Sequence, residues 1–193
     1  MNVVSKIDIK SIPFKIKNRI GSGADGEVYS ISKDKVIKFS IRYDCFCSWS
    51  KEDFDRIKSR TKSNFDFIIN NKQNDFVDVF DFNFLSEGER VFNNTLQKYF
   101  TYYYVMNKLI PINESDFIKF NLIYTALDCK ITYNKLFKFK NNFDPSYNKY
   151  INFLTKILNS KICHEDIHPK NIMMDENNNF KMIDVDRVFI KRY

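Results

Sequence analysis

The stretch of sequence that decides the fold reads His164-Glu165-Asp166-Ile167-His168-Pro169-Lys170-Asn171. It contains both histidines of the 193-residue chain. Two chemistries are open for these eight residues. His164, Glu165 and His168 have the H-E-x-x-H spacing with which a helix holds a zinc ion. If the segment is a loop instead, it presents the carboxylate of Asp166 and the amide of Asn171.

Pro169 favours the loop. A zinc-binding helix needs residues i and i+4 on one face, whereas a proline disfavours helical backbone at the residue before it, here His168. A catalytic zinc ion also needs a third protein ligand. The chain has no third histidine, and Glu176 lies beyond the proline in an asparagine-rich turn. The sequence therefore predicts a loop and disfavours a zinc site.

The residues after Asn171 predict a β-hairpin. Two short apolar stretches, 172–174 and 180–183, flank a turn rich in asparagine, which tolerates left-handed backbone. Such a hairpin begins at Asn171 and ends at Asp184, so the two side chains are expected to converge. Because Mg²⁺ prefers oxygen ligands, Asn171 and Asp184 are the candidate magnesium ligands.

Three of the four glycines lie in one short segment near the N-terminus, Gly21-Ser22-Gly23-Ala24-Asp25-Gly26-Glu27-Val28. Alternating apolar and polar residues predict a strand at 14–20, and β-branched residues predict strands at 28–31 and 36–39. The glycines therefore join two strands, unlike the dinucleotide-binding motif, in which they open a helix. Backbone amides in such a loop can cover phosphates, so the candidate nucleotide-binding residues are Gly21, Ser22, Gly23, Gly26 and Val28.

These motifs, in this order, resemble the protein kinase-like superfamily from about Ile12 to Asp184. The resemblance implies a single kinase-like domain with a bilobal α+β fold. The N-lobe, residues 1–108, would hold an antiparallel five-stranded sheet and one helix, the helix C of the family. The C-lobe, residues 109–193, would be reduced and mainly helical. ATP and Mg²⁺ are the implied cofactors.

The resemblance also implies a role for each motif residue. Asp166 would accept or orient the proton of the attacking hydroxyl, and His168 would lie beside the transferred phosphate. Asn171 and Asp184 would hold Mg²⁺, while Lys38 would grip the α- and β-phosphates. Taken alone, Lys38 would be an ordinary surface residue among 31 lysines and arginines.

Supporting roles follow from the same resemblance. His164 would brace the loop against the metal-binding segment. Residues 75–82 and 102–109 are expected to be the fourth and fifth strands, and the backbone from Met106 to Lys108 would contact adenine.

Two helices are also expected. Helix C would supply an acid that pairs with Lys38, and Glu52 is the candidate, with Asp53 and Asp55 as alternatives. Apolar residues at helical spacing predict a helix at 148–160, which leads into the catalytic loop.

The motifs point to more than one subclass. Glu165 replaces an arginine that receives an activation-loop phosphate in many protein kinases. His168 and Asp184-Val185-Asp186 are similar to aminoglycoside and choline kinases, whereas the complete glycine motif is typical of protein kinases. Only nine residues follow Asp184, which resembles compact kinases of bacterial effectors and viruses. A serine/threonine protein kinase is the first expectation; a small-molecule kinase and an ATP-binding pseudokinase acting through a protein partner stay open.

Composition indicates the surroundings. No apolar run reaches membrane-spanning length and the N-terminus lacks a signal peptide, so a cytoplasmic location is expected, in a host cell if the protein is viral or a secreted effector. The four cysteines have neither zinc nor redox spacing. A net charge of +7 favours an acidic substrate or partner protein, and no nucleic-acid recognition motif accompanies it. With 20 Phe and 11 Tyr, the core should be rich in aromatic residues.

Overall fold

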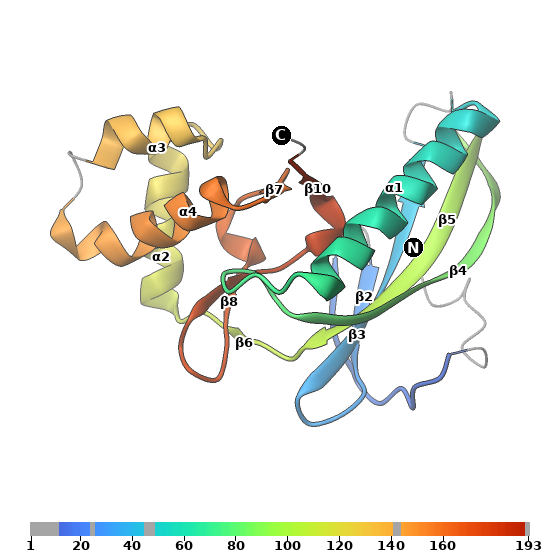
Figure 1. Cartoon of the computed structure of the whole chain (residues 1–193), viewed down its shortest axis with the longest axis horizontal. Coiled ribbons are helices and arrows are strands. Elements are labelled where there is room, and N and C mark those ends of the chain that lie inside the picture. Colours follow the sequence, from blue (N-terminus) through green and yellow to red (C-terminus); the bar gives the residue numbers. More distant parts are fainter. Residues whose placement is uncertain (1–11, 24–25, 45–48, 141–143, 192–193) are drawn as a thin grey trace. The chain divides into compact units, whose positions relative to one another are not determined.

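Five strands from the first part of the chain form one antiparallel sheet (Figure 1). The computed structural model describes residues 12–23, 26–44, 49–140 and 144–191. The spatial order of the strands is β1-β2-β3-β5-β4. Their bounds are β1 Arg19–Gly23, β2 Gly26–Ser30, β3 Lys35–Tyr43, β4 Val79–Phe92 and β5 Thr95–Asn107. The predicted five-stranded antiparallel sheet is therefore confirmed.

The last two strands of this sheet are much longer than the sequence predicted. The expected strands at 75–82 and 102–109 overlap β4 and β5 only at 79–82 and 102–107, and the two strands form a hairpin that continues to a two-residue turn at Asn93 and Asn94. Both asparagines have left-handed backbone, with φ of 48° and 59°, which suits the tight turn of a hairpin. The outer half of β4 was missed because it is mostly polar or charged; its register with β5, from Glu87↔Phe100 to Phe92↔Thr95, keeps it extended.

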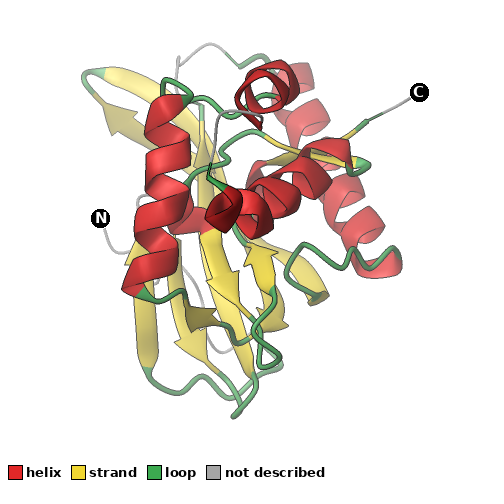
Figure 2. Ribbon diagram, turned by 90° about the vertical axis from the view of Figure 1, so that its left-hand side faces the viewer, coloured by secondary structure: helices red, strands yellow, loops and turns green. Residues whose placement is uncertain are grey.

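Helix α1 (Lys51–Asn70) covers one face of the sheet, along β4 (Figures 1 and 2). The side chain of Ser50 caps its N-terminus by accepting a hydrogen bond of 3.0 Å from the amide of Asp53. Buried residues of the helix, Phe54, Thr61, Phe65 and Ile68, recur at helical spacing. Phe65 stacks on Phe82 of β4 at 4.2 Å between ring centroids, so the core is rich in aromatic residues, as expected.

The opposite face of the sheet carries a second apolar cluster. Its buried members come from β3, β5 and the segment before β1: Ile12, Ile37, Phe39, Ile41, Tyr103 and Val105. Odd-numbered residues of β3 and β5 therefore face this cluster, and even-numbered residues face α1, as strand alternation requires. Lys38 thus lies on the helix side.

The rest of the chain consists of helices and short strands. Helices α2 (Glu114–Ala126), α3 (Tyr133–Lys140) and α4 (Asn148–Asn159) are accompanied by two small sheets, β10-β7 and β6-β8-β9. The strand bounds are β6 Ile110–Pro111, β7 Ile162–His164, β8 Ile172–Met174, β9 Phe180–Met182 and β10 Val188–Ile190. Helix α4 and the β8–β9 hairpin confirm the predictions for 148–160 and for the residues after Asn171.

Two compact units divide the chain. Unit 1 comprises residues 1–71 and 78–108, and unit 2 comprises residues 72–77 and 109–193. The segment 72–77 differs from the predicted N-lobe because it pairs with β9: Phe76 bridges Met182, and the amide of Val77 donates to the carbonyl of Met182 at 3.0 Å. Among the described residues, no helix is long and apolar enough to span a membrane.

Candidate catalytic and nucleotide-binding residues

The segment 164–171 is a loop, not a helix. Strand β7 ends at His164, and a short 3-10 helix begins only at Pro169. The two histidines therefore do not share a helix face, and the described residues contain no group of three His, Cys, Asp or Glu side chains that could hold a metal ion. The zinc interpretation of the H-E-x-x-H spacing is excluded at this segment.

His164 links the loop to the segment before Asp184. The amide of Asp166 donates to its Nδ1 at 3.1 Å, so the ring proton is on Nε2, which donates to the carbonyl of Ile183 at 2.8 Å. Burial lowers the pKa of His164 and keeps the ring neutral. Its role is to hold two chain segments together.

Asp166 is held at the surface of unit 2 by its neighbours. Asn171 Nδ2 donates to the backbone carbonyl of Asp166 at 3.0 Å and to its Oδ2 at 3.3 Å. His168 Nδ1 accepts from the amide of Lys170 at 3.0 Å, which leaves the proton on Nε2, 3.4 Å from Asp166 Oδ2. The Asp166 side chain is 37% exposed. The carboxylate is oriented and still accessible to a substrate hydroxyl.

Asn171 and the residue before Asp184 are joined through the backbone. The amide of Ile183 donates to the carbonyl of Asn171 at 2.8 Å, in continuation of the β8–β9 ladder. Because Asn171 uses Nδ2 as a donor toward Asp166, its Oδ1 is the atom left for a cation. Asp184 follows with left-handed backbone at φ 58° and ψ 45°. An amide oxygen and a carboxylate are donors that fit Mg²⁺.

The glycines of β1 and β2 serve two purposes. The strands pair through Gly21↔Val28, Ser22↔Glu27 and Gly23↔Gly26, and the connecting residues 24–25 lie outside the described chain. A Cβ on Gly26 would overlap the carbonyl oxygen of Phe39, so Gly26 lets β2 approach β3. A Cβ on Gly23 would meet no described atom within 4 Å. Packing explains Gly26 but not Gly23.

Lys38 is buried on the α1 side of β3. It is 7% exposed, lies opposite Tyr104 in the β3–β5 register, and places Nζ 5.8 Å from the centre of that ring. A lysine with so little exposed surface is not an ordinary surface residue. The structure therefore rules out the surface-lysine alternative.

Glu52 does not lie near Lys38, which corrects the expectation for helix C. Phe65 is the α1 residue that packs on Tyr104, at 5.0 Å between rings. Glu52 is 13 residues earlier, about 20 Å along the helix axis, and is exposed in its first turn. Asp53 pairs with Arg56 at 2.6 Å at the same end, and Asp55 is exposed there. The short sequence separation between Lys38 and Glu52 is the feature of the sequence that argued against this pairing.

The end of β5 offers less to adenine than expected. Met106 is buried within the strand. The amide of Asn107 donates to the carbonyl of Asp78 at 3.2 Å, and that of Lys108 donates to Asp34 at 2.8 Å. Lys108 therefore cannot donate its backbone N–H to a ligand in this arrangement, and only its carbonyl remains available.

Tyr124 of α2 lies beside the loop at 164–171, with its ring 6.4 Å from that of His168. The sequence did not predict this neighbour because no motif includes Tyr124.

No protein-family model matches the chain, and no curated protein matches it. Among solved structures, monomeric WbdD is 19% identical, with 93% of this chain and 38% of that chain covered and a TM-score of 0.42. A structure of the bifunctional kinase-methyltransferase WbdD is 17% identical, with 94% of this chain and 35% of that chain covered and a TM-score of 0.37. The ROP18 kinase domain in complex with AMP-PNP and sucrose is 13% identical, with 92% of this chain and 52% of that chain covered and a TM-score of 0.43.

The chain thus spans about a third to a half of the length of the structures it matches. A function is therefore inferred from the loop at 164–171 and from Lys38.

Proposed function

We propose that the chain is an ATP- and Mg²⁺-dependent phosphotransferase that acts on a hydroxyl group of a protein, as a serine/threonine kinase does. The observation that carries the proposal is the environment of Asp166. Its carboxylate accepts a hydrogen bond from Asn171 and lies 3.4 Å from His168 Nε2, its amide is fixed by His164, and more than a third of its side chain is exposed. A general base needs this combination of fixed geometry and access to the substrate.

In this proposal each residue has a separate task. Asp166 accepts the proton of the attacking hydroxyl, and His168 stabilises the carboxylate through its Nε2–H. Asn171 Oδ1 and the carboxylate of Asp184 would hold Mg²⁺, which neutralises charge on the phosphates. Lys38 binds the α- and β-phosphates, and the open position at Gly23 leaves room for phosphate against the β1–β2 backbone.

A second candidate is an ATP-binding module with weak catalysis that acts through a protein partner. The position of Glu52 favours it. In kinases the lysine is oriented by a helix C acid, but at the level of Tyr104 the described inward-facing residues of α1 are Thr61, Phe65 and Ile68. We also propose a reducing, cytosolic setting, supported by the free thiols of Cys129 and Cys163.

Nucleotide binding can be tested by thermal unfolding with ATP and Mg²⁺. A ligand at 100 times its Kd stabilises the native state by about 2.7 kcal/mol. We expect a shift for the wild type, none for Lys38→Met, and a wild-type shift for the control Lys33→Met, a lysine exposed in the β2–β3 turn. An equal shift for both variants would contradict the role of Lys38.

Transfer can be tested with γ-labelled ATP and cell lysate, comparing the wild type with Asp166→Asn. Labelled protein that depends on Asp166 supports the protein kinase. Labelled metabolites alone would identify a small-molecule kinase. ATP binding without transfer to either class would leave the partner-dependent module as the function.

A further inference from the structure

Tyr124 of α2 has no task in the proposed phosphotransfer, yet it lies beside the loop at 164–171 within unit 2. Its ring is 6.4 Å from that of His168 between centroids, at an interplanar angle of 61°. Aromatic rings attract one another edge-on when their centroids are roughly 4.5–7 Å apart. Helix α2 also packs beside the short 3-10 helix Pro169–Asn171 that follows His168. Tyr124 therefore supports the loop from a separate helix.

The loop alone holds the ring of His168 weakly. Its Nδ1 accepts a hydrogen bond of 3.0 Å from the amide of Lys170. Its Nε2 lies 3.4 Å from Asp166 Oδ2, which is longer than an ordinary N–H···O hydrogen bond. The χ2 torsion of histidine is broad and roughly two-fold, so a hydrogen bond at one edge of the ring does not fix its plane. A further contact is needed to keep Nε2 toward Asp166.

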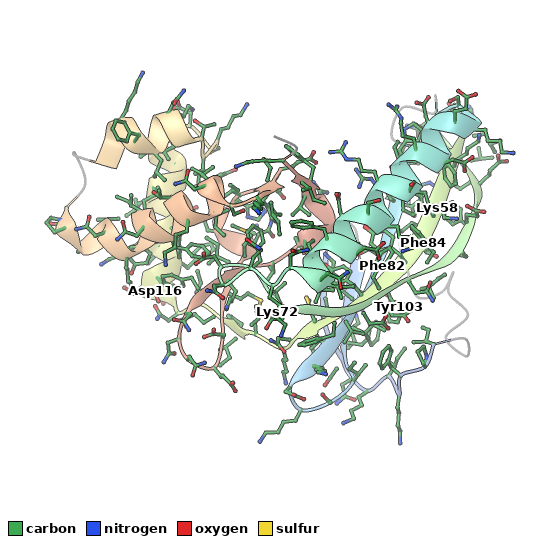
Figure 3. The ribbon with its side chains drawn as sticks, in the orientation of Figure 1. Lys58, Lys72, Phe82, Phe84, Tyr103 and Asp116 are labelled. Carbon is green, nitrogen blue, oxygen red and sulfur yellow. The ribbon has the colours of Figure 1, made fainter. Side chains whose placement is uncertain are left out.

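The beginning of α2 is anchored to α4. Asp116, in the first turn of α2, is 6% exposed (Figure 3). Its Oδ1 accepts hydrogen bonds from Lys149 Nζ at 2.8 Å and from Tyr150 Oη at 2.6 Å. Asn113 caps the same end of the helix by accepting from the amide of Asp116 at 2.8 Å. These bonds prevent α2 from sliding along its axis.

The end of α2 is held by a strained turn. Asp128 and Cys129 both have left-handed backbone, with φ of 54° and 55°, which is unfavourable for residues other than glycine. The amide of Cys129 donates to the carbonyl of Tyr124 at 2.9 Å. Lys135 Nζ donates to the carbonyl of Leu127 at 2.7 Å. Because such strain persists only where surrounding contacts enforce it, the last turn of α2, which carries Tyr124, is fixed in place.

The buried face of α2 connects Tyr124 to the same framework as the loop. Phe120 is 1% exposed, and its ring lies 4.9 Å from that of Phe180 at the start of β9. Tyr124 lies one helical turn after Phe120 and is half-buried. Strand β9 leads to Ile183, whose carbonyl accepts from His164. The helix that carries Tyr124 and the loop that carries His168 thus pack on one hairpin.

We propose that Tyr124 is a positioning residue for the phosphotransfer, an inference that rests on the proposed function. Its ring holds the imidazole of His168 in the orientation that directs Nε2–H at Asp166, and thereby keeps the carboxylate aligned for the acceptor hydroxyl. A small misplacement of such a group is costly, because catalysis depends on aligned reacting atoms. The contact involves the ring of Tyr124, so phenylalanine should replace it.

The first test needs no nucleotide. In protein labelled with ¹⁵N-histidine, the shifts of the ring nitrogens report which nitrogen carries the proton, at a pH at which imidazole is neutral. The variant His164→Gln assigns the signals of the two histidines. Tyr124→Phe keeps the ring, and Tyr124→Leu keeps apolar bulk without it. Tyr147→Leu is the matched control, because Tyr147 is a half-buried tyrosine whose ring lies 6.3 Å from that of Tyr150.

We expect the Nε2–H form of His168 in the wild type, in Tyr124→Phe and in Tyr147→Leu. In Tyr124→Leu we expect a mixture of the two neutral forms, with unchanged signals of His164. A His168 spectrum that Tyr124→Leu leaves unchanged would overturn the proposal. So would an equal change in Tyr147→Leu, or an equal change in the His164 signals, since either would indicate general loosening of unit 2.

The second test measures transfer from γ-labelled ATP to the proteins of a cell lysate. Tyr124→Leu should lower the rate at saturating ATP roughly tenfold and leave the KM for ATP unchanged, whereas Tyr124→Phe should keep the wild-type rate. Equal losses in the two variants, or a rise in KM alone, would contradict a role through His168. If the wild type transfers nothing while the His168 signals change as expected, the proposed function fails and the support of His168 by Tyr124 stands.

Discussion

Lys38 in unit 1 and Asp166 in unit 2 are held by different kinds of contact. Lys38 lies on a sheet face whose geometry depends on aromatic packing against α1, with Phe65, Phe82 and Tyr104 at the centre. Asp166 lies in a loop fixed by hydrogen bonds from side chains a few residues away. A site held by local hydrogen bonds can lose its chemistry without losing its fold. A site that is positioned by core packing cannot lose its activity through a change in that packing without also losing stability.

The largest expected effect tests whether the loop at 164–171 can lose its proposed activity without losing stability. Asp166→Asn keeps the size of the side chain and the backbone hydrogen bonds to His164 and Asn171. We expect phosphate transfer to fall by a factor of about 10²–10⁴, the usual contribution of a general base, with an unchanged melting temperature. Labelled-ATP transfer and calorimetry measure the two quantities. The control is Glu176→Gln in the exposed hairpin turn. A drop in the melting temperature of Asp166→Asn, but not of Glu176→Gln, would show that the loop cannot lose its activity without losing stability.

Unit 1 should behave in the opposite way. Phe65→Ala removes a side chain that is 1% exposed and stacked on Phe82, and should cost about 3–5 kcal/mol of unfolding free energy. ATP affinity should decrease with it, because the face that carries Lys38 is loosened. Urea denaturation and nucleotide titration measure both. Loss of stability with normal ATP affinity would show that the lysine is positioned independently of α1.

The glycine strands allow a comparison within unit 1. Gly26→Ala should cost about 1–3 kcal/mol of unfolding free energy, because its Cβ overlaps the carbonyl of Phe39. Gly23→Ala has no described neighbour to meet, so it should preserve stability and weaken ATP binding only. Denaturant titration of the two variants tests this. Equal destabilisation would remove the distinction between the two glycines.

His164 makes the stability of unit 2 depend on pH. Because burial lowers its pKa below the ordinary value of 6.5, the unfolded chain takes up the proton first as the pH falls. The stabilisation is complete above pH 6.5 and is lost as the pH falls toward the lower pKa of the folded state. Urea denaturation at about pH 7.5 and about pH 5.5 should show a smaller pH effect for His164→Gln than for the wild type. Equal pH effects would contradict a neutral buried ring.

The smallest expected effect concerns helix C. Glu52→Gln should leave ATP affinity within about twofold of the wild type, because the exposed Glu52 lies about 20 Å along α1 from the level of Lys38. The nucleotide titration used for Phe65→Ala serves here as well. A larger loss would mean that α1 shifts when nucleotide binds.

The same difference between the units explains what could be predicted from the sequence. The loop at 164–171, the hairpin after it and the buried face of α4 depend on residues close in sequence, so spacing and one proline were sufficient. The register of α1 against β5 depends on which phenylalanine meets which tyrosine across many residues. No local pattern encodes that register, so only the chemistry of its side chain pointed to Glu52.

The pairing of segment 72–77 with β9 has a consequence for the connectivity of the protein. The chain leaves unit 1 after Asn71, returns at Asp78 and leaves again after Lys108. A single cut after Lys108 would deprive the downstream fragment of Phe76, which is 1% exposed and bridges Met182. The upstream fragment would contain all of unit 1, but unit 2 would be divided, so reconstitution of unit 2 from two pieces would require the upstream piece to supply segment 72–77 in trans.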